Sequence, residues 1–172
     1  KTDGSGNEQW REEYEDVLAA EAQQTSDGGY IIIGDGTGNV LSFSGDTLIK
    51  TDGSGNEQWS KTFLIGDGCA GASVQQTADG GYITTGATYS ITPTFSVNTN
   101  VYLTKTDVNG DSLWSKNFGH ILEPEIAYSV QQTTDGGYVM TGYLPGYLSG
   151  SGDGDVYLIK TNSIGDSLWT KT

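Results

Sequence analysis

Oxygen-bearing side chains recur at alternate positions in three short segments of the sequence. The segments contain Asp3, Ser5 and Asn7; Asp52, Ser54 and Asn56; and Asp107, Asn109 and Asp111. Short calcium loops present oxygen ligands at this alternate spacing, so these residues are candidate Ca²⁺ ligands. The same residue types are typical of tight turns, because Asp and Asn side chains accept hydrogen bonds from nearby backbone N–H groups. We favour a structural turn and keep calcium as the alternative.

The calcium alternative lacks part of the pattern that an EF-hand loop requires. The position of the closing bidentate glutamate holds Tyr14, Phe63 and Phe118 in the three segments. A fourth copy of the segment has Ile164 at its middle ligand position. A looser calcium candidate is the acidic, glycine-rich stretch 149–155, which we interpret as a loop.

Four tryptophans recur with the same segments, at Trp10, Trp59, Trp114 and Trp169. Exposed, they would be stacking platforms for sugar rings; buried, they would pack between neighbouring sheets. Their strand context recurs with them and an indole buries a large area, so packing between sheets is favoured. A lectin with these four indoles as platforms is the alternative. The same interpretation applies to three recurring tyrosines, Tyr30, Tyr82 and Tyr138.

Residues suited to catalysis are few. The single histidine, His120, has Glu123 and Glu125 nearby, and the single cysteine is Cys69. Acidic residues are so numerous that a carboxylate pair can be assembled almost anywhere, so their abundance assigns no active site. The segment 66–71 matches the G-x-G-x-x-G fingerprint, but a strand-like stretch follows where that motif needs a helix. We therefore expect no catalytic residue, and no cofactor beyond the calcium alternative.

Two phrases repeat in step along the chain. Lys-Thr-Asp-Gly-Ser-Gly-Asn-Glu-Gln-Trp occurs identically at 1–10 and 50–59, and in drifted form at 105–114 and 160–169. Gln-Gln-Thr-x-Asp-Gly-Gly-Tyr occurs at 23–30, 75–82 and 131–138, and all three copies match at every fixed position. The tryptophans are separated by 49, 55 and 55 residues. Two phrases that keep a fixed order indicate duplication of one structural unit.

Each unit predicts four short strands. In the third unit the β-prone runs are 127–133, 138–142, 155–160 and 167–171. The Asp-Gly between the first two runs predicts a hairpin with a primed turn, since glycine adopts positive φ without penalty. Segment 11–24 is rich in helix formers, but its counterparts in later units read as strand, loop and strand. The repeat therefore favours a strand there, with a short helical turn as the alternative.

Four antiparallel strands in a unit of about 50 to 55 residues are typical of a β-propeller blade. The sequence thus predicts an all-β fold, either a β-propeller or a partial one. Segments 17–63, 68–118 and 124–172 would be blades, and 1–16 the outer half of a preceding blade. Propellers close with about four to eight blades, so the ring would be completed by further blades of a longer chain or by self-association.

Composition excludes several classes of partner. Asp and Glu total 22 against 8 Lys and Arg, which gives a formal net charge of −14. Such a charge repels phosphate backbones and anionic lipid, so we expect no nucleic-acid partner and no basic membrane docking. The longest apolar runs, such as 30–33, are far too short for membrane insertion. One cysteine makes no internal disulfide, and one histidine adds too few ligands for a tetrahedral zinc site.

The phrases at 50–61 and 131–138 resemble the tandem propeller-type repeats of large secreted or cell-surface proteins in bacteria, notably Bacteroidota, and in archaea. The resemblance covers essentially the whole chain. It implies an extracellular or cell-surface location and a non-catalytic role, and it transfers no catalytic residues. We therefore expect a structural or interaction module of the adhesion type, with a protein or glycan surface as its partner. The alternatives are a glycan-binding propeller and a hydrolase with its site on the channel face.

Overall fold

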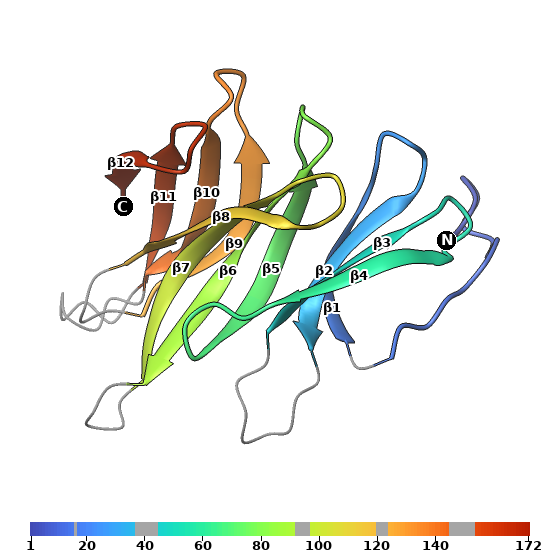
Figure 1. Cartoon of the computed structure of the whole chain (residues 1–172), viewed down its shortest axis with the longest axis horizontal. Helices are drawn as coiled ribbons and strands as arrows, with labels where there is room; N and C mark the ends of the chain where they lie inside the picture. Colours follow the sequence, from blue (N-terminus) through green and yellow to red (C-terminus); the bar gives the residue numbers. More distant parts are fainter. Residues whose placement is uncertain (16, 37–44, 92–96, 120–123, 145–153) are drawn as a thin grey trace.

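The protein is a row of three antiparallel β-sheets, each built from four strands in sequence order (Figure 1). The computed structural model describes residues 1–15, 17–36, 45–91, 97–119, 124–144 and 154–172. Across these residues all twelve regular elements are strands, which confirms the all-β prediction. No helix within them is long and apolar enough to cross a membrane.

The strands of each sheet are consecutive in the chain. The first sheet contains β1 (Val17–Gln24), β2 (Tyr30–Gly36), β3 (Asp46–Thr51) and β4 (Glu57–Phe63). The second contains β5 (Gly68–Gln76), β6 (Tyr82–Ile91), β7 (Val97–Thr106) and β8 (Ser112–Phe118). The third contains β9 (Ile126–Gln132), β10 (Tyr138–Leu144), β11 (Asp155–Thr161) and β12 (Ser167–Lys171). Each sheet is therefore one up-and-down meander.

Strand β1 forms from a segment whose residues favour helix locally. It pairs with β2 from Val17 opposite Gly36 to Gln24 opposite Tyr30. Helix propensity differs by only a few tenths of a kcal/mol per residue between most residue types, so sheet pairing and packing override it. The repeat was the better guide than local propensity.

The turn between the first two strands of each sheet uses the Asp-Gly-Gly of the repeated phrase. In the first sheet the Thr25 N–H donates to the Gly29 carbonyl, and the Gly28 N–H donates to the Thr25 carbonyl. The same pair of bonds recurs at Thr77 and Thr133. They enclose a three-residue loop in which Gly28 has a φ of 83°. This is a longer loop than the two-residue primed turn that Asp-Gly alone predicts.

Successive sheets meet along their first strands. Strand β5 packs on β1 and β2, and β9 packs on β5 and β6. Backbone N–H groups of one first strand donate to side chains of the preceding one: Val74 to Glu21 at 2.7 Å, and Gln132 to Gln75 at 2.5 Å. The two chain ends lie at opposite ends of the row (Figure 1). The described residues form three neighbouring sheets and do not close a ring.

The apolar core lies between sheets, in two clusters. The cluster between the first and second sheets contains Ile31, Ile33, Leu48, Val74 and Tyr82. The cluster between the second and third contains Ile83, Val101, Leu103, Ala127, Val130, Tyr138, Met140, Tyr157 and Ile159. A single sheet has no core of its own, so the junction between two sheets is the unit that stabilises the fold.

Candidate functional site

The repeated tryptophans pack across the junctions between sheets. Trp59 on β4 lies edge-on against Tyr82 on β6, with ring centroids 5.8 Å apart. Trp114 on β8 makes the same contact with Tyr138 on β10, at 5.9 Å. The segment that precedes β1, residues 1–15 and called the leading segment below, repeats this contact at the start of the row, where Trp10 lies 5.7 Å from Tyr30. Edge-to-face aromatic pairs of this kind contribute about 0.5–1.5 kcal/mol beyond their area burial.

Each of these indoles also covers a glycine in the next sheet. A Cβ on Gly55 would lie 2.6 Å from the Trp10 ring, and a Cβ on Gly110 the same distance from Trp59. Gly165 stands in the same relation to Trp114. These glycines have φ between 79° and 91°, which side-chain-bearing residues rarely adopt. Glycine in the Trp phrase therefore serves both the turn and the docking of the preceding sheet.

Polar contacts repeat across the same junctions. The Gln76 side-chain oxygen accepts from the Ser26 backbone N–H at 2.8 Å, and that of Gln132 accepts from Ala78 at 2.9 Å. Two ion pairs follow the same spacing in the chain: Lys61 with Asp111 at 2.8 Å, and Lys116 with Asp166 at 3.0 Å. Equivalent side chains therefore make these contacts at both junctions.

Within the described part of the chain, the outer face of the last sheet has no such cover. All residues of β3 are buried, as are the last six of β7, whereas β11 begins with two exposed residues and then alternates between buried and partly buried ones. Val156 is 68% exposed, while Val101, at the same distance before the lysine of its own sheet, is 0% exposed. Trp169 is 44% exposed, although Trp59 and Trp114 are half-buried. The outer face of the third sheet thus presents one half of a junction.

The first sheet has the complementary face at the other end of the row. Ala22 on β1 is exposed, whereas Val74 and Val130, at the same place in β5 and β9, are 0% and 2% exposed. Among the described residues, the leading segment 1–15 covers this face. Its Trp10 occupies the position that Trp59 has on the second sheet, and its Tyr14 corresponds to Phe63.

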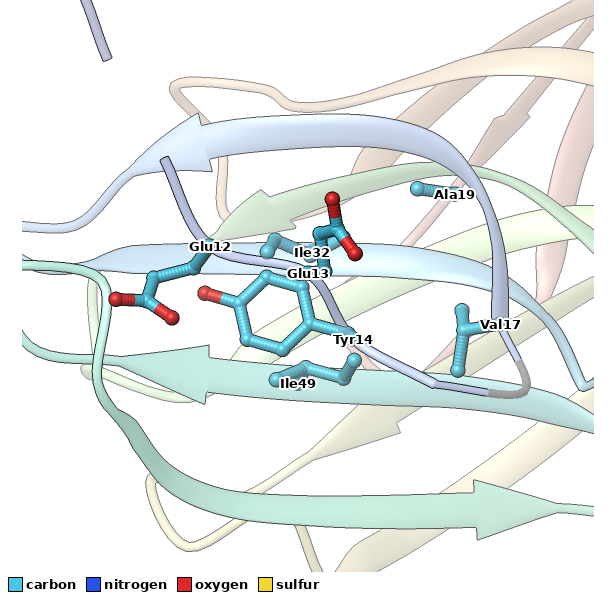
Figure 2. Close-up of a pocket in the computed structure, with 7 residues that line it drawn as sticks. All are labelled: Glu12, Glu13, Tyr14, Val17, Ala19, Ile32 and Ile49. Carbon is cyan, nitrogen blue, oxygen red and sulfur yellow. The ribbon is translucent and has the colours of Figure 1, made fainter. Parts of the chain in front are cut away.

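A hollow of about 420 Å³ remains beneath the leading segment. Figure 2 shows the Tyr14 ring between Ile32 and Ile49, with the Glu12 and Glu13 carboxylates on opposite sides of it. The Tyr14 hydroxyl donates to the Gly55 carbonyl at 2.7 Å. In the junction between the second and third sheets, the corresponding residues Met140 and Ile159 belong to the apolar cluster. The hollow is therefore the part of a junction that one strand alone does not fill.

A buried lysine ties the two hairpins of each sheet together. Lys50 Nζ lies 2.9 Å from Asp27 Oδ2 and donates to the Thr51 carbonyl at 2.7 Å. The Thr25 hydroxyl, with Lys50 and the Gly29 N–H, holds the pKa of Asp27 well below its usual range. A Cβ on Gly29 would overlap the Thr51 carbonyl, which explains the second glycine of the phrase.

The same bonds recur in the other two sheets. Lys105 contacts Asp79 and the Thr106 carbonyl, and Lys160 contacts Asp135 and the Thr161 carbonyl. The side chains of Lys50 and Lys105 are each 5% exposed, and that of Lys160 is 12% exposed. A buried ammonium group requires hydrogen-bond partners, and these contacts supply them. The lysine of the Trp phrase is therefore structural, a role that the motif alone did not reveal.

The calcium candidates Asp52, Ser54 and Asn56 lie together in the turn before β4. Asp52 Oδ1 accepts from the Ser54 and Asn56 backbone N–H groups at 2.8 and 3.0 Å, and Oδ2 accepts from the Asn56 amide at 2.8 Å. The Asn56 amide is the largest of the causes that lower the pKa of Asp52, and the two backbone donors add to it. Both oxygens thus have donors within the turn.

The turn before β8 is built in the same way. Asp107 Oδ1 accepts from the backbone of Asn109 and Asp111 at 2.9 and 2.8 Å. In the fourth copy Asn162 replaces the aspartate and its amide oxygen accepts the equivalent bonds, from Ile164 and Asp166 at 3.1 and 2.8 Å. Within the described residues no group of three or more His, Cys, Asp or Glu side chains is arranged to hold a metal.

A buried acidic residue, Asp46, lies at the junction of the first and second sheets. It is 2% exposed, and neither of its carboxylate oxygens has a hydrogen-bond partner among the described residues. Burial raises the pKa of Asp46 to about 7, and the Asp35 carboxylate adds to the rise. Tyr102 and Cys69 lie near the carboxylate and act in the opposite direction, lowering the pKa of Asp46. At neutral pH this side chain is therefore poised between its neutral and charged forms.

The groups around Asp46 respond to the same burial. The Cys69 thiol donates to the Phe63 carbonyl at 3.3 Å, and burial together with the Asp46 charge raises the pKa of Cys69 to about 12. Burial also raises the pKa of Asp35, although the Gly71 N–H donates to its carboxylate at 2.9 Å. Asp46 and Cys69 are buried, at 2% and 3% exposure, whereas Asp35 is partly exposed.

Sequence reasoning did not single out Asp46. An alignment of the three units would have shown it, because an acidic residue stands there at a position that is apolar in the other two units. Asp46 stands four residues before Lys50, where the other units have Val101 and Val156 before their lysines. Glu125 is another buried acid at a junction: it is 0% exposed and stands six residues before Gln131, where the second unit has Cys69 before Gln75.

Several predicted residues lie outside the described part of the chain. These are His120, Glu123 and most of the loose calcium candidate 149–155. Segment 66–71, with its dinucleotide-like fingerprint, runs into strand β5.

Comparison with known proteins gives a structural likeness only. No protein-family model and no curated protein matches the sequence. Among solved structures, a protein of unknown function from Bacteroides caccae, with a crystal structure at 1.35 Å resolution, is similar with a TM-score of 0.49. The two chains are 10% identical over 97% of this chain and 72% of the other.

Proposed function

We propose that this chain is a section of a β-propeller-type repeat array, an extracellular, non-catalytic module whose role is structural and adhesive. Each four-stranded sheet would be a blade, and its faces would be sites of association with further blades. The extracellular location rests on the resemblance of the repeated phrases to surface-protein repeats.

The observation that carries this proposal is the repetition of one set of contacts at successive junctions. Trp59 and Trp114 meet Tyr82 and Tyr138 at nearly equal distances, and the polar contacts recur with them. In repeat arrays each unit contacts only its neighbours, and the recurring residues form the interfaces between units. The half-junction around Trp169 indicates what kind of surface such an array would add next.

The non-catalytic part of the proposal is supported by where the carboxylates lie. Asp46 is closed to solvent, and the two glutamates in the hollow of Figure 2 are adjacent in sequence and exposed. A glycosidase requires two carboxyl groups facing one substrate bond, with one of them in an environment that retains its proton. The glycan-binding alternative depends on Trp169, the most exposed of the four indoles among the described sheets.

A chain extended by one unit tests the proposal. A second copy of residues 118–172 fused after Thr172 should place a new tyrosine on Trp169 and bury its indole. We expect a higher unfolding temperature and weaker acrylamide quenching of Trp169 fluorescence, measured in a background where the other tryptophans are phenylalanine. The matched control carries serine in place of the new copy's tyrosine. Unchanged quenching in both fusions would contradict the proposal.

A further inference from the structure

The two end faces of the row are the two halves of one junction. The third sheet presents Val156, Leu158 and Trp169, whose counterparts in the second sheet, Val101, Leu103 and Trp114, contact the third sheet. The first sheet presents Ala22, Tyr30 and Ile32, whose counterparts in the third sheet, Val130, Tyr138 and Met140, receive that contact. The chain therefore carries both a donor face and an acceptor face for the same kind of contact.

We propose that two copies of this chain associate head to tail, with the third sheet of each copy docked on the first sheet of the other. The inference rests on the proposed function and names the partner of its exposed faces. Two copies supply six sheets, which lies within the range of about four to eight blades that closed propellers use. A closed dimer leaves neither face exposed, whereas a head-to-tail contact that failed to close would extend as a filament.

The leading segment competes with this association. Trp10 already packs against Tyr30 and Gly55, which is the position that Trp169 of the second copy would take. The segment contributes one strand-like stretch where a docked sheet contributes four, and the hollow beside Tyr14 shows what it leaves unfilled. Displacement of the segment is thus compensated by the larger apolar area that a whole sheet covers.

Charge opposes the association at low ionic strength. The chain has a net charge of −14, so two copies repel each other until salt screens them. We therefore expect the dimer to be favoured by raised salt as well as by raised protein concentration.

Sedimentation velocity on the full chain, at rising concentration and at low and high salt, tests the proposal. We expect a monomer–dimer equilibrium. Trp169→Ala should weaken the dimer about 30-fold, as loss of a central interface tryptophan does. Trp10→Ala should strengthen it about tenfold, because it loosens the competing segment. Because the two effects are independent, the double variant should lie between the single variants, about threefold weaker than the wild type.

A second pair of variants separates docking from folding. Val156→Lys places a charge on the docking face and should abolish the dimer. Leu113→Lys is the matched control, because Leu113 is 59% exposed on a sheet whose two faces are already covered. Circular dichroism should show that both variants fold.

A monomer under all conditions, or a dimer unaffected by Trp169→Ala and Val156→Lys, would overturn the proposal. Species that grow beyond the dimer would overturn the closed arrangement. If the chain stays monomeric while the fused unit still protects Trp169, self-docking fails and the array function stands. If neither occurs, both fail.

Discussion

Asp35 on β2 and Asp46 on β3 lie directly opposite each other, so two carboxyl groups meet beside the junction of the first two sheets. Like charges at opposed positions of an antiparallel pair destabilise a sheet. Asp35 has the Gly71 N–H as a donor, while the oxygens of Asp46 have none among the described residues. The pair is therefore most stable with a proton on Asp46.

Stability should fall as pH rises because of Asp46. Its folded pKa of about 7 lies above the ordinary value of 3.8, so the folded form retains its proton over a range in which the unfolded chain has lost it. As pH rises, the loss of stability begins near pH 3.8, the ordinary pKa, and is complete above about pH 7, the folded pKa. Asp46→Val should remove this pH-dependent loss, and so stabilise the protein by up to about 4 kcal/mol at pH 8, with little effect at pH 4.

Urea unfolding at a series of pH values measures this difference. Several aspartates with lowered pKa, including Asp27 and Asp135, stabilise the protein above the ordinary aspartate range and lose that effect in acid. These aspartates are present in both the wild type and Asp46→Val. The difference between the two unfolding free energies, plotted against pH, therefore isolates the contribution of Asp46. A wild-type and variant pair whose stability difference does not change with pH would refute the assignment.

Cys69 should report on the opening of the first junction. The thiol is 3% exposed, and its pKa is raised to about 12, so it has little thiolate at pH 8. We expect a thiol-specific reagent to label the folded protein very slowly and the urea-unfolded protein at once. Rapid labelling under native conditions would show that the junction opens freely.

The four tryptophans should differ in their contribution to stability. Trp114→Ala removes a contact with Tyr138 and uncovers Gly165, and should cost about 3 kcal/mol in the free energy of unfolding. Trp169→Ala, on the uncovered face, should cost less than about 1 kcal/mol in the monomer. Urea denaturation at low protein concentration makes the comparison. Equal losses would indicate that Trp169 packs against this chain as fully as Trp114 does.

Buried and exposed lysines should respond differently to the same substitution. Lys105→Met leaves the Thr106 carbonyl without its ammonium donor and should cost about 2 kcal/mol in the free energy of unfolding. Lys116→Met removes only the pair with Asp166, whose two side chains are 41% and 52% exposed, and should cost less than about 1 kcal/mol. Thermal unfolding of the two variants side by side checks this. A larger loss for Lys116 would contradict the structural role of Lys105.

The turn aspartates should act through backbone hydrogen bonds. Asp107→Ala should lower the unfolding temperature, because two backbone N–H groups lose their acceptor. Asp107→Asn should be nearly neutral, since Asn162 accepts the same bonds in the fourth copy. Differential scanning calorimetry with Ca²⁺ or a chelator should give the same unfolding temperature. A calcium-dependent rise that Asp107→Asn abolishes would instead favour the metal alternative.

The repeat made the strands predictable because it sampled each element several times. Val17–Gln24 favours helix when read alone, but its counterparts do not, and the structure follows the counterparts. The packing of Trp59 and Trp114 against the next sheet was predictable for the same reason, since their surroundings recur with them.

The buried polar groups were not predictable from one strand at a time. Lys50 and Asp46 lie on a strand buried on both faces, and that burial comes from the neighbouring strands and sheets rather than from β3 itself. The angle between successive sheets is likewise absent from local sequence patterns. It depends on how side chains such as Tyr82 and Val74 fill the junction, so the number of sheets in a complete ring stays a prediction.

The junctions join each sheet only to the next one, and this restricts how the protein comes apart. The middle sheet is held from both sides, whereas the first and third are each held by one full junction. Unfolding should therefore begin at the ends and proceed inward, with amide hydrogen exchange slowest in β6 and β7. Cooperativity in such a molecule depends on the strength of its couplings, and a weakened junction would divide one melting transition into two.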